Sequence, residues 1–321
     1  MLDFAKIEGT KNRRALPGER GDDMVSSKYI FALGFFDGVH LGHRALLKTC
    51  CALAEQTNSE TAAITFEAHP KSLFAGPVPL ISTVRDRQRL LHHYGICHIH
   101  TYPVTAEVMG MPWEAFLEEL LEKGAAGFVC GDDFHFGRKG EGNPQRLAQF
   151  CEERGLPCRI VSEQTLDGKR ISSTRIRRKI EEGNMESATR LLGHPHTLTG
   201  TVIHGKHLGS KLGFPTANLL LPEGTVTPKF GVYACRAIVD GISYPAVTNV
   251  GTRPTVAGTG ITVEPWILDF EGDLYDREIV LEFYYFLRPE MKFADLSALQ
   301  QQIFRDRDDT RAYFRNLKEG I

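Results

Sequence analysis

No apolar run in the sequence approaches the roughly 20 residues that a helix needs to cross a bilayer. The first 24 residues also lack the apolar core and small-residue cleavage site of a secretory signal. The seven cysteines are an odd number, and no C-x-x-C pair occurs among them. This pattern argues against a disulfide framework and against a thiolate zinc site. We therefore predict a cytoplasmic protein with reduced thiols and no membrane partner.

An excess of charge of one sign is missing as well, because 38 lysines and arginines meet 40 aspartates and glutamates, for a net charge of −2. A basic surface for nucleic acid is therefore not expected. The chain also lacks the G-x-x-x-x-G-K-[ST] phosphate loop. Any phosphate chemistry must come from other local sites, so we expect small-molecule partners and a monomer or weak homo-oligomer.

The length and composition are those of an ordinary globular protein with 42% hydrophobic residues. At roughly 150 residues per domain, 321 residues predict two domains. Between residues 28 and 192, short apolar runs alternate with amphipathic helical stretches, which predicts a doubly wound α/β domain with a parallel sheet. The expected strands are 29–36, 62–66, 96–102, 127–131 and 157–161, and the expected helices are 42–56, 84–93, 113–123 and 144–154.

The pattern changes after residue 192. Residues 193–200 have no apolar period, which predicts a linker or a first turn. Beyond them, closely spaced β-rich segments predict an antiparallel barrel or sandwich, followed by an amphipathic helix at 294–317. These segments are 199–205, 231–241, 242–251, 261–270 and 277–288. We therefore predict two domains, residues 1–190 and 191–321.

The segment GFFDGVHLGH (34–43) stands where the first strand should give way to the first helix. Its glycines, Gly34, Gly38 and Gly42, allow a close approach of backbone to a ligand, and the N–H groups that start a helix attract anions. His40 and His43 could both point toward one phosphate and stabilise charge on it. Taken alone, two histidines three residues apart could equally be surface residues or metal ligands.

The whole segment resembles the signature of the nucleotidyltransferase superfamily in its bacterial flavin adenylyltransferase version. From about Lys28 to the C-terminal helix, the chain resembles the bifunctional riboflavin kinase/FAD synthetase family. This resemblance implies that Gly34, Phe36, Asp37, Gly38 and Gly42 bind nucleotide or flavin and that the histidines serve catalysis. The implied reaction joins FMN to the AMP part of ATP, with magnesium neutralising the phosphates and pyrophosphate leaving.

Three later segments match the same family in order. TFEAHPKSLF (65–74) implies that Glu67 and His69 lie near nucleotide or flavin, and GDDFHFG (131–137) implies the same for Asp133. In RISSTRIRRKI (170–180), Ser173 and Thr174 start a helix whose N–H groups can hold ATP phosphates, with cationic support from Arg170, Arg175 and Arg177. Without the family, these segments would be two turns and a helix cap with a basic face.

A second phosphate site is predicted at HGKHLGSKLGFPTANL (204–219). Gly205, Gly209 and Gly213 make the loop flexible, and Lys206 and Lys211 can meet phosphate charge. After Pro215, Thr216 and Asn218 offer hard oxygen ligands suited to magnesium. A glycine-rich hairpin is the other interpretation of the loop. Its LGFPTAN string resembles the riboflavin kinase signature, which implies that Thr216 and Asn218 bind magnesium with the ATP phosphates.

The catalytic candidate of this half is Glu264 in TVEPWILDF (262–270). A carboxylate near the ribityl 5′-hydroxyl of riboflavin could take its proton as that oxygen attacks the γ-phosphate of ATP. Without the family, Glu264 would be an exposed position on an alternating strand. NVGTRPTV (249–256) matches a family loop near flavin and nucleotide, which implies binding roles for Asn249 and Arg253.

The chain departs from the family pattern at four positions, Phe35, Ala68, Ser210 and Pro265. We predict an enzyme that makes FMN from riboflavin and then FAD from FMN, with ATP as the donor in both steps. The departures leave open an enzyme with only one of these activities. A flavin-binding sensor and a metal-dependent hydrolase built on His40, His43 and His69 are weaker alternatives. A pure sensor would need no general base, and a hydrolase would need a tightly bound transition metal.

Overall fold

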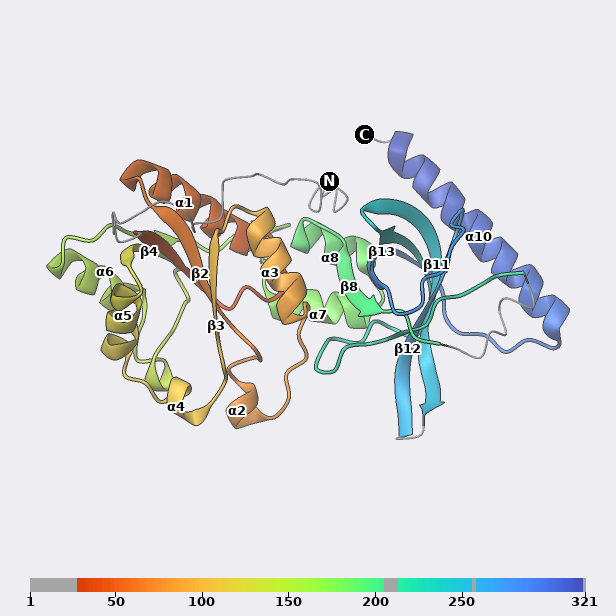
Figure 1. Ribbon diagram of the computed structural model, residues 1–321, viewed down its shortest axis with the longest axis horizontal. Coiled ribbons are helices and arrows are strands. Elements are labelled where there is room, and N and C mark those ends of the chain that lie inside the picture. The colour runs from red at the N-terminus through yellow and green to blue at the C-terminus, as the bar shows by residue number, and fades with distance from the viewer. Residues whose placement is uncertain (1–27, 205–212, 256–257, 320–321) are drawn as a thin grey trace, which may run out of the picture. The chain divides into compact units, whose positions relative to one another are not determined.

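The structure is a computed structural model that describes residues 28–204, 213–255 and 258–319. It divides into two compact units (Figure 1). The first comprises residues 28–80 and Val84–Ser173, and the second comprises Thr174–Ile321 with Ile81–Thr83. The second unit includes helix α8 (Met185–Leu192). It also includes helix α7 (Ser173–Glu181) except for its first residue. The boundary at residues 190/191 stays a prediction.

Five parallel strands form the sheet of the first unit, in the order β3-β2-β1-β4-β5. They are β1 (Tyr29–Leu33), β2 (Glu60–Phe66), β3 (His98–Tyr102), β4 (Ala125–Gly131) and β5 (Cys158–Val161). The predicted doubly wound sheet is confirmed. The order reverses direction beside β1, so the crevice between the carboxyl ends of β1 and β4 is the expected place for a ligand.

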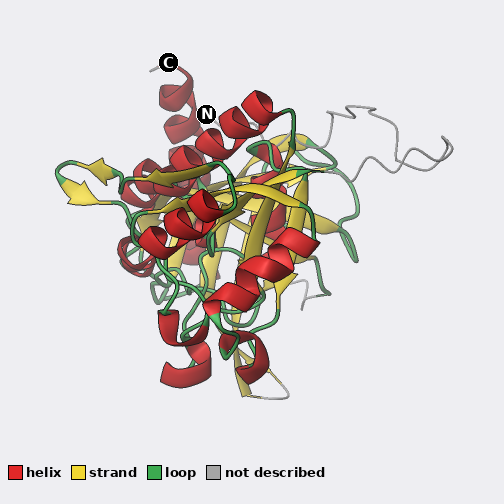
Figure 2. Cartoon of the chain, turned by 90° about the vertical axis from the view of Figure 1, so that its left-hand side faces the viewer, coloured by secondary structure: helices red, strands yellow, loops and turns green. Residues whose placement is uncertain are grey.

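Helices cover both faces of this sheet, as Figure 2 shows for the unit that faces the viewer. They are α1 (Leu41–Thr57), α2 (Ser72–Ala75), α3 (Val84–His93), α4 (Ala106–Met109), α5 (Trp113–Glu122) and α6 (Pro144–Glu153). Phe31 and Leu33 of β1 pack with Phe116 of α5 and Leu147 of α6 in one apolar cluster. Helix α1 contacts β1, β2 and β4. Burial on both faces explains why the strands appear as continuous apolar runs.

The predicted strand at 29–36 ends early, at Leu33. Phe36 adopts a left-handed conformation with φ of 59°, and a short 3-10 turn follows at Asp37–Val39. A two-stranded hairpin, β6 (Thr165–Leu166) and β7 (Lys169–Arg170), precedes α7. The sequence did not predict the turn or the hairpin, because each is too short to show a period.

The second unit is built on six antiparallel strands in the order β8-β13-β10-β11-β12-β9. They are β8 (His196–Thr201), β9 (Leu219–Leu220), β10 (Gly231–Val239), β11 (Ile242–Thr255), β12 (Gly258–Ile267) and β13 (Glu278–Arg288). An antiparallel bridge between Ile203 and Asn218 joins the continuations of β8 and β9 and nearly closes the sheet. The predicted antiparallel barrel is therefore confirmed.

The predicted linker or first turn at 193–200 covers only residues 193–195, and the rest of the segment is a strand. Residues His196–Thr201 form β8 and pair with β13, and His196, Thr197, Leu198 and Thr199 are all buried. Threonine favours β structure but is polar, so the strand shows no alternation of apolar and polar residues. The sequence pattern therefore did not indicate it.

The predicted final helix is confirmed as α10 (Leu296–Glu319). It contacts β10 and β11, and Phe314 packs against Ala234 and Tyr284 in a shared cluster. The helix therefore covers one face of the barrel.

Buried His196 makes the second unit sensitive to acid. Burial, with His194 nearby, lowers the pKa of His196 to about 3. In the unfolded chain the pKa of this histidine is about 6.5. Between about pH 6.5 and pH 3 the unfolded chain therefore binds a proton that the folded chain does not, so the free energy of unfolding falls as the pH falls. We expect the second unit to lose roughly 2–3 kcal/mol more between pH 7 and 4.5 than a His196→Leu variant loses.

Trp266 alone reports on this unit in a Trp113→Phe background, because the chain has two tryptophans. Urea unfolding followed by Trp266 fluorescence measures the difference, with His204→Leu at an exposed histidine as the control. Equal pH slopes with and without His196 would contradict the assignment.

Candidate active sites

The turn after β1 brings the two signature histidines to the carboxyl edge of the sheet. Phe36, Gly38 and Val39 have φ of 59°, 74° and 39°. Such values are rare for a β-branched residue, so Val39 marks a strained backbone of the kind that collects at functional sites. The turn ends at His40, which is the N-cap of α1.

His40 and His43 form one stacked pair. Their ring centroids lie 3.6 Å apart at 12°, and Nδ1 of His40 accepts a hydrogen bond from the backbone N–H of His43 at 3.3 Å. The buried ring of Phe36 meets the His43 ring edge-on at 5.3 Å. Nδ1 of His43 is buried and makes no hydrogen bond to any described residue. Burial, and then His40 and Arg87, lower the pKa of His43 well below its usual value, so the ring is neutral at pH 7.

Two signature glycines leave room for these rings. A Cβ at Gly34 would lie 2.8 Å from the tip of the Phe36 ring. A Cβ at Gly42 would lie 3.2 Å from the His40 ring. The glycines therefore serve the packing of side chains within the turn.

Arg87 of α3 is a site residue that the sequence analysis missed. Its side chain is fully buried, and Nη1 donates to Oγ1 of Thr65 and the carbonyl of Phe66, both at 2.7 Å. The guanidinium lies 4.6 Å from the centre of the Phe35 ring. Burial lowers the pKa of Arg87, and nearby Asp37, itself buried, opposes that shift. In the run VRDRQR nothing sets Arg87 apart from a solvated helical face.

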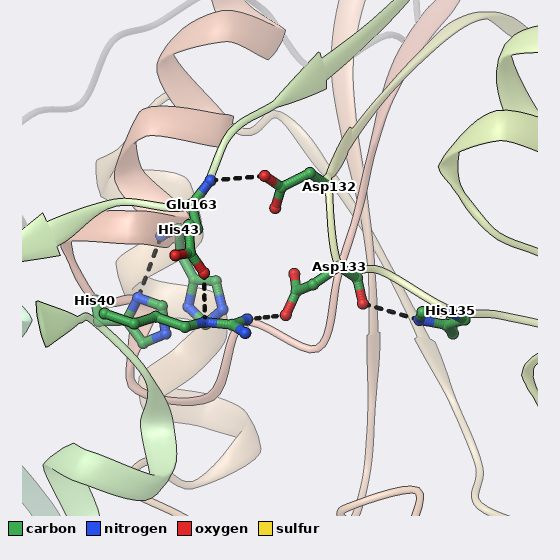
Figure 3. Close-up of polar contacts among 7 residues, drawn as sticks. His40, His43, Asp132, Asp133, His135 and Glu163 are labelled. Carbon is green, nitrogen blue, oxygen red and sulfur yellow. Dashed lines mark hydrogen bonds and ion pairs between the residues drawn. The ribbon is translucent and has the colours of Figure 1, made fainter.

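Charged side chains gather beyond β4 and β5 (Figure 3). Arg170 forms an ion pair with Asp133 and a second one with Glu163 at 3.4 Å. The backbone N–H of Glu163 donates to Asp132 at 3.0 Å. A Cβ at Gly42 would lie 4.0 Å from the side chain of Gln164, so this loop borders the start of α1. The structure therefore brings Asp133 and Arg170 to the crevice beside β1, together with Glu163, which was not predicted.

Ser173 and His69 also reach the turn after β1. Oγ of Ser173 donates to the carbonyl of Asp37 at 3.3 Å, and the ring of His69 meets that of Phe35 at 5.1 Å. The ring of Phe35 thus contacts both His69 and Arg87.

For the remaining predicted residues of the first unit's motifs, the structure gives the position and the burial. Glu67 is exposed at the end of β2, next to the half-buried Ala68. Phe36 and Asp37 are fully buried beneath the turn. Thr174 and Arg177 follow on α7 in the second unit, and Arg177 is buried.

The second unit holds a pocket of about 600 Å³ between its sheet and α10. Thr216, Asn249 and Glu264 line it together, although they are far apart in the sequence. Asn249 and Glu264 are direct neighbours in the β11–β12 register. The structure therefore gathers three of the predicted kinase residues in one pocket.

Apolar and polar side chains both line this pocket. Side chains two residues apart along a strand share a face, so the next pair, Val247 and Trp266, continues the same wall. Phe214, Leu299 and Ile303 add apolar surface around it. Such an amphipathic pocket suits a ligand with a flat apolar ring and a hydroxylated tail.

An ion pair joins the sheet to the helix at this pocket. The guanidinium of Arg288, at the end of β13, binds both carboxylate oxygens of Asp306 on α10 through Nε and Nη2 at 2.7–3.1 Å. Asp306 is buried, and both side chains line the pocket. The sequence analysis missed this pair because its members lie 18 residues apart in no known motif.

Thr216 also lines a second, smaller hollow of about 110 Å³, with Pro215, Pro265 and Tyr275. The carbonyl of Pro265 accepts a hydrogen bond from the N–H of Ala217 at 2.9 Å and so points away from β11. In an antiparallel strand the nitrogen and the carbonyl of a residue point to the same side, so the nitrogen of Pro265 also faces away from β11. The β9–β12 pairing ends before Pro265, as expected for a proline that cannot donate a hydrogen bond. Asn218 is buried, and its carbonyl accepts from Ile203.

Several predicted residues fall outside this description. Gly205, Ser210 and Lys211 lie outside the described residues, as does the side chain of Arg253. Gly213 is exposed with φ of 86°, and a Cβ there would meet nothing, so its backbone conformation explains the glycine.

Family models match each half of the chain separately. A model described as FAD synthetase matches residues 22–175, and one described as riboflavin kinase matches residues 192–314. Among curated relatives, the bifunctional riboflavin kinase/FMN adenylyltransferase of Listeria monocytogenes is 36% identical, covering 93% of this chain and 96% of the relative. The protein of that name from Escherichia coli strain K12 is 37% identical, covering 89% and 92%.

One solved structure is similar over most of the chain. It is titled a macrolide-efflux protein from Streptococcus pneumoniae, and the match has a TM-score of 0.80 and 28% identity, covering 90% of this chain and 96% of that one. In the part of the present chain that the structure describes, no helix is both long and apolar enough to span a membrane.

The stacked histidines give a spectroscopic prediction. We expect His43 to stay neutral in an NMR titration until the pH is well below 6.5, because burial and the nearby His40 and Arg87 oppose its charged form. A His40→Asn variant removes one of these opposing groups, so the pKa of His43 should rise. A His43 that titrates at about pH 6.5, the ordinary value for histidine, would contradict the lowered pKa.

Proposed function

The chain belongs to the bifunctional riboflavin kinase/FMN adenylyltransferase family, and we propose that its second unit phosphorylates riboflavin while its first unit adenylylates the resulting FMN. One observation carries this assignment. The FAD synthetase model matches residues of the unit with the histidine pair, and the riboflavin kinase model matches residues of the unit with the Glu264 pocket. Glu264 lies in the amphipathic pocket of one unit, and the histidine pair lies at the sheet edge of the other.

In the kinase step, Glu264 acts as the general base. Its carboxylate takes the proton from the ribityl 5′-hydroxyl as that oxygen attacks the γ-phosphorus of ATP, and the bond to the bridging oxygen breaks to release ADP. The pocket supports this role because apolar side chains in its lining, among them Val247 and Trp266, suit the isoalloxazine ring. The ribityl chain then points along the wall toward Asn249 and Glu264.

In the adenylyl step, an oxygen of the FMN phosphate attacks the α-phosphorus of ATP, and pyrophosphate leaves. The nucleophile is already an anion, so the protein supplies position and charge stabilisation. His40 and His43 can donate ring N–H groups to the α-phosphate, and the unpartnered Nδ1 of His43 supports this role. Buried Arg87 adds a fixed positive charge nearby.

Magnesium fits the donors of the kinase site. Thr216 lines both the larger pocket and the smaller hollow, and Asn218 follows it by two residues, so each offers a neutral hard oxygen close to the site. A bound magnesium ion would neutralise the ATP phosphates there. Thr216 and Asn218 would hold it, together with the phosphates.

The proposal includes the setting as well as the chemistry. We assign FAD synthesis to residues 1–190 and riboflavin phosphorylation to 191–321, in a cytoplasmic monomer or weak homo-oligomer. The net charge of −2 supports small-molecule partners, because both sites use local groups to bind phosphate.

Opposite losses are expected when the two sites are disabled one at a time. Glu264→Ala should lower FMN formation from riboflavin by about 10²–10⁴-fold, the usual contribution of a general base. Conversion of FMN to FAD should persist. Chromatography of the flavins formed with ATP and magnesium measures both, and Glu264→Gln serves as a control of equal size.

His43→Ala should lower FAD formation from FMN by about 10²–10³-fold, the usual cost of one donor to the transition state, while FMN formation from riboflavin persists. Loss of both reactions in either folded variant would refute two separate sites. FMN that accumulates in the wild type without any FAD would refute the adenylyl half.

Removal of divalent metal tests the ligand set. We expect a chelator to stop both reactions, because unneutralised phosphates repel the incoming oxygen, and added magnesium to restore them. Thr216→Val should weaken the magnesium dependence of the kinase step alone. An unchanged magnesium requirement in that variant would remove Thr216 from the metal site.

A further inference from the structure

The kinase pocket contains a second carboxylate, Glu290, beside Glu264. It follows β13 by two residues, is exposed, and lines the 600 Å³ pocket. A methyl group built on Gly251 of β11 would overlap Oε1 of Glu290. The same methyl group would lie 3.4 Å from the amide nitrogen of Asn249. The carboxylate of Glu290 therefore occupies the volume above a glycine, next to Asn249.

The register of β11 and β12 shows which end of the pocket this is. Val247 pairs with Trp266, Asn249 with Glu264, and Gly251 with Thr262, in successive rows of one face. The wall therefore runs from an apolar row through the row of Glu264 to the row covered by Glu290. Along this wall, Glu290 lies beyond the row of Asn249 and Glu264, on the side away from Trp266.

A carboxylate in that place is an acceptor for hydroxyl groups. An ionised carboxylate has no donor of its own, and its hydrogen bonds are stronger than those of neutral acceptors. The hydroxylated part of riboflavin is its ribityl chain, whereas the ring system is flat and mostly apolar. Given the proposed function, we infer that Glu290 binds a ribityl hydroxyl of riboflavin and so directs the terminal hydroxyl toward Glu264.

The same contact explains the glycine at position 251. Gly251 has no left-handed φ, so its backbone does not require glycine. The atoms that crowd its Cβ position most closely belong to Glu290. Gly251 thus reserves the place of the Glu290 carboxylate, and an alanine there would push the carboxylate away without straining the strand.

Kinase assays with riboflavin and lumiflavin separate the contacts, because lumiflavin has the ring system but no ribityl chain. In Glu290→Ala we expect the KM for riboflavin to rise roughly 10- to 100-fold, the cost of one hydrogen bond to a charged group. The inhibition constant of lumiflavin should stay unchanged. Glu290→Gln keeps one acceptor oxygen and should recover part of the loss, and Glu223→Ala changes an exposed carboxylate that lines neither hollow.

The glycine provides an independent arm. Gly251→Ala should raise the KM for riboflavin as Glu290→Ala does, and the double variant should be no worse than either single one, because both changes remove the same contact. Additive losses would show that Gly251 acts through something other than Glu290. Urea unfolding followed by Trp266 fluorescence in a Trp113→Phe background confirms that each variant is folded.

Each outcome decides one claim. An unchanged riboflavin KM in Glu290→Ala, or equal weakening of riboflavin and lumiflavin, overturns the ribityl contact. A wild type that forms no FMN refutes the proposed kinase function instead. In that case the ratio of riboflavin to lumiflavin affinity, measured by quenching of Trp266 in wild type and Glu290→Ala, still tests the contact.

Discussion

Both sites depend on a steric constraint: functional side chains lie where a Cβ would otherwise stand. The ring of Phe36, which supports His43, lies over Gly34, and the ring of His40 lies beside Gly42. In the other unit, Glu290 lies over Gly251. Close packing leaves few voids in a folded protein, so the volume for an active-site group must be reserved by the sequence. Glycine leaves this volume free because it has no Cβ, so no neighbouring atom has to move.

Two arginines, one buried and one half-buried, hold the elements around these sites together. Arg87 bonds to Thr65 and Phe66 at the end of β2 and lies against Phe35 beyond β1, so it fixes the ends of two strands. Arg288 binds Asp306 and fixes α10 beside the kinase pocket. Removing one partner of a buried charge is costly, because the other partner remains without its counter-charge or acceptor. These contacts therefore set the shape of each site before any substrate binds.

The sequence predicted those parts of the fold that leave a periodic or motif-level trace. The five strands of the parallel sheet and most of its helices appear as apolar periods, and the histidine turn and Thr216 belong to recognisable strings. Strand β8 was missed because His196, Thr197 and Thr199 are polar yet buried. Arg87 and Glu290 were missed for another reason. Their importance comes from long-range contacts with Thr65 and Gly251, and neither pairing has a local signal.

The two reactions require different groups, and the residues proposed for each site differ accordingly. A riboflavin hydroxyl is neutral and must lose a proton before it becomes a good nucleophile, so a carboxylate such as Glu264 is useful there. The FMN phosphate already carries negative charge, so the second site needs donors and cations, which His43 and Arg87 can supply. The first reaction thus produces a nucleophile that the second can use without a base. A chain with both units can therefore combine a basic carboxylate site with a histidine–arginine site and still carry almost no net charge.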